Sequence, residues 1–363
     1  MADFSEVFED VTKLGHKIPK ENYLDEGKYP IIDQGQTYIA GYSNNSEGLY
    51  SDVPAIIFGD HTRIIKYVDM PCFLGADGVK LLHVKDKDND VKYLYYALCN
   101  ARIPDTGYNR HFKWLKEITI PLPPLPEQRR IAAVLDKVSE LIALRKRQLD
   151  LLDEMVKARF VEMFGDLIVN NLNWSQVQLS NVATTRLGKM LDAKKQTGKN
   201  TYPYLANFNV QWFQFKLDNL NQMDFDESDQ IEFALEYGDL LVCEGGEVGR
   251  CAVWKNQVNN CFFQKALHRI RCDKSIIIPD YLAWWFKVHA NYNSFDDIVG
   301  SKATIPHLTG IKLKQLMIEV PPIDLQNQFA DFVQQVDKSK ATVQQGLDRL
   351  NLLKSALMQE YFG

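Results

Sequence analysis

The most regular pattern along the chain is a seven-residue repeat of apolar positions between residues 127 and 164. Such a repeat is typical of a helix packed lengthwise on another helix. The stretch contains no Pro or Gly, Pro126 can occupy the first helical position, and Gly165 suits the residue just beyond a helix end. These features predict a helix from Glu127 to Phe164, roughly 55 Å long. The repeat consists of Leu135, Ile142, Leu149, Val156 and Met163, with Ile131, Val138 and Leu152 on the companion seam.

A second copy of this helix lies at the end of the same chain. Residues 314–363 align with residues 116–165 without a gap, at a constant offset of 198, and fifteen of the fifty positions are identical. Identity of that extent indicates an internal duplication. We therefore expect the second helix to pack on the first through a further apolar set, which comprises Phe329, Val336, Val343, Leu347, Leu350 and Leu357.

The apolar seams of the two copies differ in their charged positions. Arg145 of the first copy aligns with Val343, whereas Lys340 of the second aligns with Ile142. We interpret this as two helices packed on each other, each with a charged side that faces outward or towards another subunit. In the alternative interpretation, each helix packs only on its own domain.

The segments before each long helix resemble one another more weakly. The first contains short β-like runs at 55–58 and 79–84 and a helical pattern at 91–101, and the Tyr-Leu pair that opens this pattern recurs at Tyr281. We expect an α+β fold, in which two mixed α/β domains are separated by two long antiparallel helices as a pseudo-two-fold internal repeat. The expected boundaries are 1–120, 121–165, 166–318 and 319–363.

This arrangement predicts two equivalent globular segments at opposite ends of a helical pair. A ligand that offers two separated, symmetry-related sites suits such a protein. Duplex DNA is one, because dimeric DNA-binding proteins contact half-sites about 34 Å apart, or multiples of that distance. The pattern thus makes DNA a plausible ligand.

Composition restricts the class of protein further. An apolar fraction of 45%, an acidic N-terminus and the absence of a long apolar run predict a cytoplasmic protein with no membrane association. The six cysteines form no CxxC pair, so we expect reduced core residues and no metal site. A net charge of −5 argues against bulk attraction to nucleic acid, so DNA binding requires local basic faces or a basic partner.

Two stretches of the first segment carry candidate DNA contacts. His61, Thr62 and Arg63 emerge at a turn after an expected strand, and the alternative is an ordinary solvated turn. Residues 107–114 interleave polar and cationic side chains with three aromatic residues, a composition that suits base and phosphate contacts. The alternative is a loop packed by its own aromatics. The candidates in this stretch are Asn109, Arg110, His111 and Lys113.

The second segment offers two comparable stretches. A glycine-rich turn at 244–250 contains Gly246 and Arg250, and its backbone N–H groups suit a phosphate, although a tight turn alone is the alternative. Residues 301–308 precede the second long helix much as 108–111 precede the first. The candidates there are Lys302, Thr304 and His307.

Motifs of catalysis are missing from the sequence. We find no P-loop, no Asn/Asp-Pro-Pro-aromatic tetrapeptide, no PD…ExK arrangement, no GxSxG and no HExxH. The chain therefore has the features of a protein that binds DNA without an active site of its own.

These motifs together resemble the specificity subunit of a Type I restriction-modification enzyme, from end to end of the chain. The resemblance is carried by PLPPLPEQRRIAAVLD and VPPIDLQNQFADFV at the helix starts, by FGDHTRIIKYVD and GYNRHFK in the first half, and by GDLLVCEGG and SKATIPHLT in the second. It implies two target recognition domains, each reading half of a bipartite double-stranded DNA site. It further implies that the coiled-coil helices set the spacing and dock two modification subunits.

The resemblance also assigns the chemistry to other subunits. The modification subunits would bind S-adenosylmethionine and methylate adenine, and restriction subunits would use ATP and Mg. This chain would hold no cofactor and no metal. The implied DNA contacts are the candidates above together with Asn207 and Asn209. Two alternatives remain, a specificity subunit of a methylation-only complex and a helical scaffold with no DNA role.

Overall fold

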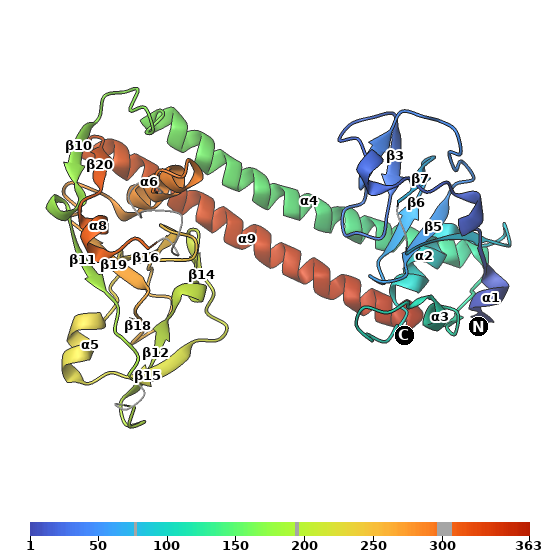
Figure 1. Ribbon diagram of the computed structural model, residues 1–363. Coiled ribbons are helices and arrows are strands. Elements are labelled where there is room, and N and C mark those ends of the chain that lie inside the picture. The colour runs from blue at the N-terminus through green and yellow to red at the C-terminus, as the bar shows by residue number, and fades with distance from the viewer. Residues whose placement is uncertain (76–77, 193–195, 296–306) are drawn as a thin grey trace. The chain divides into compact units, whose positions relative to one another are not determined.

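The computed structural model describes residues 1–75, 78–192, 196–295 and 307–363 in two compact units. The first unit comprises Met1–Gln148 with Val343–Gly363, and the second comprises Leu149–Thr342. Two 40-residue helices, α4 (Leu125–Phe164) and α9 (Ile323–Phe362), each contribute one part to either unit (Figure 1). Their bounds differ by the offset of 198 that the sequence alignment gave, so the duplication is confirmed.

Both helices follow the predicted pattern with small differences at the ends. Helix α4 begins at Leu125, so Pro126 is its second residue rather than its first. It ends as expected, because Gly165 adopts a positive φ of 72° and its N–H donates to the Val161 carbonyl at 2.9 Å.

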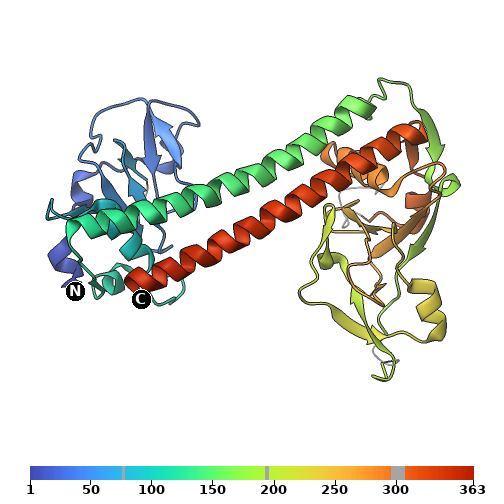
Figure 2. The same ribbon diagram turned by 180° about the vertical axis from the view of Figure 1, so that it is seen from behind.

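The two helices run antiparallel within each unit (Figures 1 and 2). In the first unit, the start of α4 and the end of α9 share one apolar cluster, in which Leu135 is fully buried beside Leu357. In the second unit, the end of α4 meets the start of α9, where the Phe160 and Phe329 rings lie 5.3 Å apart. The predicted antiparallel pair is therefore confirmed.

Three sheets build the globular part of the first unit. A four-stranded antiparallel sheet has the order β2-β8-β5-β6, a three-stranded sheet has the order β4-β3-β7, and β1 pairs with β9. The strands are β1 (Ala2–Asp3), β2 (Phe8–Asp10), β3 (Tyr29–Ile32), β4 (Gly41–Ser43), β5 (Ala55–Gly59), β6 (Ile65–Val68), β7 (Phe73–Leu74), β8 (Val79–Val84) and β9 (Thr119–Ile120). The helices are α1 (Phe4–Val7), η1 (Thr12–Leu14), η2 (Lys20–Asn22), α2 (Val91–Cys99) and α3 (Phe112–Leu115).

The second unit repeats this topology strand for strand. Its sheets have the orders β11-β19-β16-β17, β15-β12-β18 and β10-β20, and a short β13-β14 hairpin is added. The strands are β10 (Ser175–Gln178), β11 (Ala183–Leu187), β12 (Thr201–Leu205), β13 (Val210–Gln211), β14 (Gln214–Phe215), β15 (Asn221–Asp224), β16 (Leu240–Cys243), β17 (Cys251–Val253), β18 (Phe262–Phe263), β19 (Leu267–Cys272) and β20 (Met317–Val320). The helices are η3 (Leu179–Asn181), η5 (Asn207–Asn209), α5 (Glu227–Phe233), α6 (Pro279–Asn291) and α8 (Gly310–Lys314).

Equivalent buried side chains hold each long helix to its domain. The Gln128 amide accepts from the Asp90 N–H at 2.9 Å and donates to the Pro123 carbonyl at 2.9 Å. Gln326 repeats both contacts, with the Ile278 N–H at 2.9 Å and the Pro321 carbonyl at 2.7 Å. These glutamines bond the backbone at the starts of α2 and α6, where helical N–H groups lack intrahelical partners. The repeat is thus preserved in contacts as well as in topology.

The apolar residues predicted for helix packing lie mostly in the interior. Those fully buried are Ile131, Leu135, Val138, Val156, Phe329, Val336, Val343 and Leu347, and those partly buried are Ile142, Leu149, Leu152, Leu350 and Leu357. Several of them pack on a globular core as well as on the other helix, so the alternative, in which each helix packs only on its own domain, is wrong. Lys340 forms an ion pair with Asp153 across the pair, which gives this seam cation a partner on the neighbouring helix.

The cysteines follow the prediction with one exception. Five of the six are buried, whereas Cys99 at the end of α2 is exposed. All six are free thiols. Cys99 follows the buried Leu98 directly in sequence, but a helix turns successive side chains by about 100°, so Cys99 lies off the buried face of α2.

Candidate nucleic-acid interface

The turn after β5 is held by backbone and side-chain hydrogen bonds. Thr62 donates from its hydroxyl to the Gln34 carbonyl at 2.7 Å, and the Ile64 N–H donates back to that hydroxyl at 3.3 Å. Gly59 is required here, since a Cβ atom at this position would lie 2.2 Å from the Thr62 hydroxyl. Thr62 therefore shapes the turn, and Arg63 follows in a left-handed conformation with φ of 61°.

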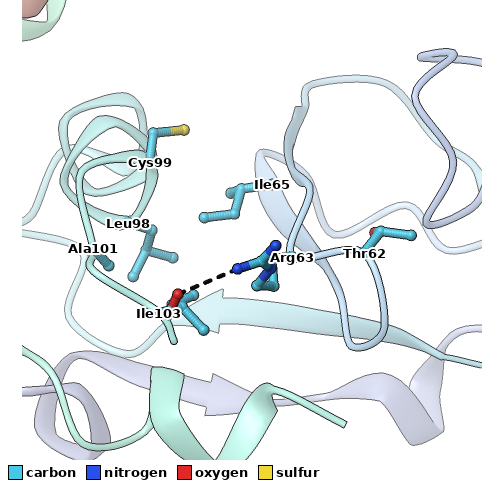
Figure 3. Close-up of a pocket in the computed structure, with 7 residues that line it drawn as sticks. All are labelled: Thr62, Arg63, Ile65, Leu98, Cys99, Ala101 and Ile103. Atoms are coloured by element: carbon cyan, nitrogen blue, oxygen red, sulfur yellow. Dashed lines mark hydrogen bonds between the residues drawn. The ribbon is translucent and has the colours of Figure 1, made fainter. Parts of the chain in front are cut away.

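Arg63 is directed to the neighbouring loop. Its guanidinium lies 2.7 Å from the Asp105 carboxylate and 3.5 Å from the Ile103 carbonyl (Figure 3). The Gly107 N–H, followed by the Arg63 guanidinium, holds the pKa of Asp105 below its ordinary value. A phosphate that approaches Arg63 would have to compete with this carboxylate.

Residues 107–114 lie against the same turn. The exposed Tyr108 ring stacks on His61 with centroids 4.8 Å apart and planes 9° from parallel. Asn109, Arg110 and Lys113 are exposed, and Arg110 makes no hydrogen bond or ion pair within the part of the chain that the structure describes. The structure thus brings the two predicted stretches of the first unit together.

His111 differs from its neighbours because it is only 1% exposed. The backbone N–H of His111 donates to the Asp60 carbonyl at 2.8 Å, and the Nδ1 atom of its ring lies 3.0 Å from the same oxygen. The Asp60 carboxylate in turn accepts from the Phe112 N–H at 2.7 Å. His111 and Asp60 therefore couple the loop to the turn, so His111 is placed to position the loop.

Replacing Asp60 by alanine tests this coupling. We expect a loss of about 2 kcal/mol in the free energy of unfolding, because the buried Phe112 N–H loses its acceptor. Urea denaturation should measure this loss. Amide hydrogen exchange of residues 107–114 should be faster in the variant than in the unsubstituted protein. The matched control is Asp105→Ala, which removes a solvent-exposed acceptor of the Arg63 guanidinium and of the Gly107 N–H and should cost much less stability. Equal effects of the two substitutions would contradict the assignment.

The second unit brings Asn207 and Arg250 together beside the glycine-rich turn. The Asn207 amide donates to the Gly245 carbonyl at 2.9 Å, and Arg250 donates to the Asn207 side-chain oxygen at 2.8 Å. Gly246 is exposed and has a positive φ of 77°, and a Cβ atom there would come no closer than 3.9 Å to the Asn207 side chain. The glycine-rich turn is thus stabilised by side chains, and its contact with a phosphate stays a prediction.

The remaining candidates of the second unit have different positions. Asn209 is buried, accepts from the Ala206 N–H at 2.9 Å and donates to the Lys216 carbonyl at 2.9 Å, so it shapes the backbone. His307 is exposed, and the next residue donates from its N–H to the Glu244 carbonyl at 2.7 Å. Lys302 and Thr304 lie outside the described residues.

Sequence reasoning missed two residues that organise the first site. Gln34 accepts from the His61 N–H at 3.2 Å, but it lies in a turn-rich stretch without any distinguishing signal. Tyr108 lies in the predicted loop but was not among the candidates, although an aromatic residue between polar ones indicates a ring available for stacking, here on His61.

The described residues contain neither a metal-binding cluster nor a membrane-spanning helix. No group of three or more His, Cys, Asp or Glu side chains there is arranged to hold a metal ion. Within the same residues, no helix combines the length and apolar character needed to span a membrane.

Two copies of one mixed α/β module, each followed by a long helix, define a duplicated protein whose modules carry exposed polar loops. The sequence matches the family described as the Type I restriction modification DNA specificity domain at residues 3–154 and 171–352. The chain belongs to this family. It is accordingly the DNA specificity component of a Type I restriction-modification system, and not the catalytic component of such a system.

Individual relatives agree with this assignment. The chain is 22% identical to the Type I restriction enzyme EcoR124I/EcoR124II specificity subunit of Escherichia coli, over 94% of this chain and 87% of that protein. It is 23% identical to a putative Type I restriction enzyme specificity subunit of Haemophilus influenzae, over 90% and 84% respectively. The fold is similar to that of the Type-I restriction-modification system S subunit from M. genitalium, with a TM-score of 0.63, 16% identity, and coverage of 99% of this chain and 95% of that one.

Proposed function

We propose that this chain recognises a bipartite DNA site, with one half read by each unit. The observation that carries the proposal is the strand-for-strand repetition of one module, including the paired contacts of Gln128 and Gln326. Two copies of one DNA-reading module suit two short sequence blocks separated by a gap. Variable loops on a constant fold then allow the two blocks to differ.

The proposed base and phosphate contacts come from the exposed loops. In the first unit, Asn109, Arg110 and Lys113 act directly, with His61, Thr62 and Arg63 beside them. His111 and Asn209 act by positioning backbone. In the second unit, the contacts are Asn207, Arg250, His307 and the Gly246 backbone, with Lys302 and Thr304 proposed from the sequence alone.

We further propose that the long helices dock two modification subunits and, through them, restriction subunits. Apolar side chains remain exposed on both helices outside their mutual seam, which favours contact with further helices. They are Leu141, Leu144, Leu151, Met155 and Val161 on α4, with Leu352 and Leu353 on α9. In this proposal residues 1–120 and 166–318 read DNA, and residues 121–165 and 319–363 form the spacer and dock.

The chemistry in this proposal resides on the partner subunits. The modification subunits bind S-adenosylmethionine and methylate adenine, and the restriction subunits use ATP and Mg. A methylation-only complex, which contains no restriction subunits, is the second candidate. DNA cleavage by the assembled complex in the presence of ATP and Mg distinguishes the two.

The test is to express this chain with its modification subunits in a methylation-free host and to map N6-methyladenine across the genome. We expect methylation at a split motif, with two short specific blocks around a fixed gap. A continuous motif, or a stable complex that leaves no new methylation, would overturn the bipartite proposal.

A further inference from the structure

The second unit contains a hairpin that has no counterpart among the described residues of the first. Its tip, Trp212-Phe213, connects β13 and β14 and lies against strand β17 and helix α6. The Phe213 N–H donates to the Cys251 carbonyl at 2.9 Å, and the Phe213 ring stacks on Trp284 at 4.5 Å. The Lys287 ammonium lies 4.4 Å from the Trp212 ring centroid. The hairpin tip therefore covers the edge of the four-stranded sheet.

The repeat identifies the equivalent place in the first unit. The Gly59 N–H donates to the Ile64 carbonyl at 2.8 Å, and the Cys243 N–H donates to the Arg250 carbonyl at the same distance. The residues that follow these acceptors are therefore equivalent, so Ile65 occupies the position of Cys251. On the helix, Tyr93 and Tyr281 are equivalent, since their hydroxyls bond the carbonyls of Pro121 and Glu319 at 2.8 and 2.7 Å. Counting along both helices from these tyrosines pairs Tyr96 with Trp284 and Cys99 with Lys287.

The loop that forms the hairpin is much shorter in the first unit. Residues 206–220 connect β12 to β15, whereas only residues 33–40 connect the equivalent strands β3 and β4. The short loop reaches β6 through side chains. The Tyr38 hydroxyl donates to the Tyr67 carbonyl at 2.8 Å, and the Lys66 ammonium donates to the Asp33 and Thr37 carbonyls at 2.7 and 2.6 Å. It does not supply a counterpart to the Phe213 contact.

A groove remains at this place in the first unit. Two adjoining hollows of about 280 and 630 Å³ share Ile65 in their walls (Figure 3). The smaller is lined by Leu98, Cys99 and Ile103, and on its other side by Thr62 and Arg63, whose guanidinium is paired with Asp105. The larger is lined by Tyr95 and Tyr96. Strand β6 is the edge of its sheet, so the groove combines an open strand edge with an aromatic wall.

The backbone of Ile65 faces this groove. Because the neighbouring residue Ile64 uses its carbonyl in the ladder with β5, the Ile65 N–H and carbonyl point away from β5. No hydrogen bond to the Ile65 carbonyl is formed within the described part of the chain. The equivalent Cys251 carbonyl accepts from Phe213. The first unit thus offers the backbone acceptor without the segment that uses it.

We propose that this groove binds a hairpin or extended segment of a partner protein that presents an aromatic residue and a free backbone N–H. The aromatic ring enters the larger hollow beside the half-buried Tyr95, and the N–H donates to the Ile65 carbonyl, as the Phe213 N–H donates to Cys251 in the second unit. Strand-edge recognition of this kind takes its affinity from main-chain hydrogen bonds and its specificity from side-chain pockets. The inference does not depend on the proposed division of the DNA site.

The charges around the groove favour a protein segment over DNA. The larger hollow is lined by Asp69, Asp136 and Glu140, whose carboxylates would repel phosphate. Two of its cations are engaged within the chain, because Lys66 lies 3.6 Å from Asp33 and Lys354 lies over the Tyr96 ring. Lys92, which lines the same hollow, lies 3.6 Å from Asp136 and is thus already paired. The hairpin of this chain already occupies its own site, so we assign the groove to another protein.

Cys99 makes the proposal testable, because it lines the groove and is the one exposed cysteine of the six. The probe is a fluorescein-labelled peptide that copies residues 208–216, and the control peptide carries alanine at Trp212 and Phe213. We expect the probe to bind the full chain and to slow the alkylation of Cys99 by iodoacetamide. The control peptide should bind about tenfold more weakly, since it lacks both rings.

Two variants separate binding in the groove from binding elsewhere. Cys99→Trp fills the smaller hollow and should abolish the fluorescence anisotropy change of the probe. Cys99→Ser, in which the new side chain has about the size of cysteine, should retain this change. Equal binding of probe and control peptides, or undiminished binding to Cys99→Trp, would overturn the proposal. Protection of Cys99 by duplex DNA and not by the probe would also overturn it and would assign the groove to DNA.

Discussion

Replacing Gln326 by leucine is expected to lower the free energy of unfolding by about 4 kcal/mol. The side chain is fully buried and joins three backbone groups, those of Ile276, Ile278 and Pro321. Leucine has a similar size but neither donates nor accepts, so these groups would be left without their partners in the interior. Each lost bond removes about 1 kcal/mol, and each stranded group adds a further desolvation cost.

Urea denaturation of the full chain, followed by circular dichroism, measures this effect. The matched control is Gln328→Leu two residues along α9, where the side chain is exposed and the expected change is within about 0.5 kcal/mol. Gln128→Leu should repeat the loss in the first unit, because its contacts are equivalent. If the two units unfold in separate transitions, each substitution should shift only the transition of the unit that contains it. A change below 1 kcal/mol at both glutamines would show that the repeated contacts do not hold the helices.

Much of the fold was predictable because the long helices have a strong and simple pattern. The heptad positions, the absence of Pro and Gly inside and Gly165 beyond the end gave α4 to within two residues. The ungapped alignment gave α9 from α4. It also placed Gln128 on Gln326, but it did not reveal their role, because an alignment does not show which backbone groups lie near a side chain. That role depends on α2 and α6, which are distant in sequence.

The candidate site was predictable only in part, for a physical reason. Polar residues such as His, Asn and Thr serve equally well as DNA contacts and as partners for buried backbone groups. His111 and Arg110 are adjacent in sequence, yet His111 is buried against Asp60 whereas Arg110 is exposed. Asn209 is likewise buried, and Asn207 supports Arg250. Residue type marked the loops correctly, but tertiary contacts decide which side chains face outward.

The open groove at Ile65 was beyond the reach of sequence comparison for a related reason. The alignment of the globular segments is weak, and the extra hairpin appears only as additional loop length. The hairpin covers the edge strand β17 of the second unit through Phe213, whereas the equivalent edge strand β6 of the first unit is open at Ile65. A loop difference between repeats thus becomes a difference in the surface that each offers to partners.

Replacing Arg110 by alanine is expected to weaken recognition of one half of the DNA site by about 10- to 100-fold, because a bidentate arginine contact to guanine contributes about 1–3 kcal/mol. Arg110 is exposed and makes no hydrogen bond or ion pair among the described residues, so its removal should leave the stability of the first unit unchanged. Methylation mapping of the complex should then show relaxed sequence preference in one block of the split motif and an unaltered second block.

The same experiment separates Arg110 from a general electrostatic effect. Lys137→Ala removes a cation from the exposed face of α4, where it pairs with Glu140, and should leave both blocks unchanged. If Arg110 contacts only a phosphate, all sequences should be bound more weakly by a similar factor, and the salt dependence of binding should fall by about one ion without relaxed specificity. If both blocks relax equally, Arg110 does not belong to a half-site, and the assignment of the first unit to one block fails with it.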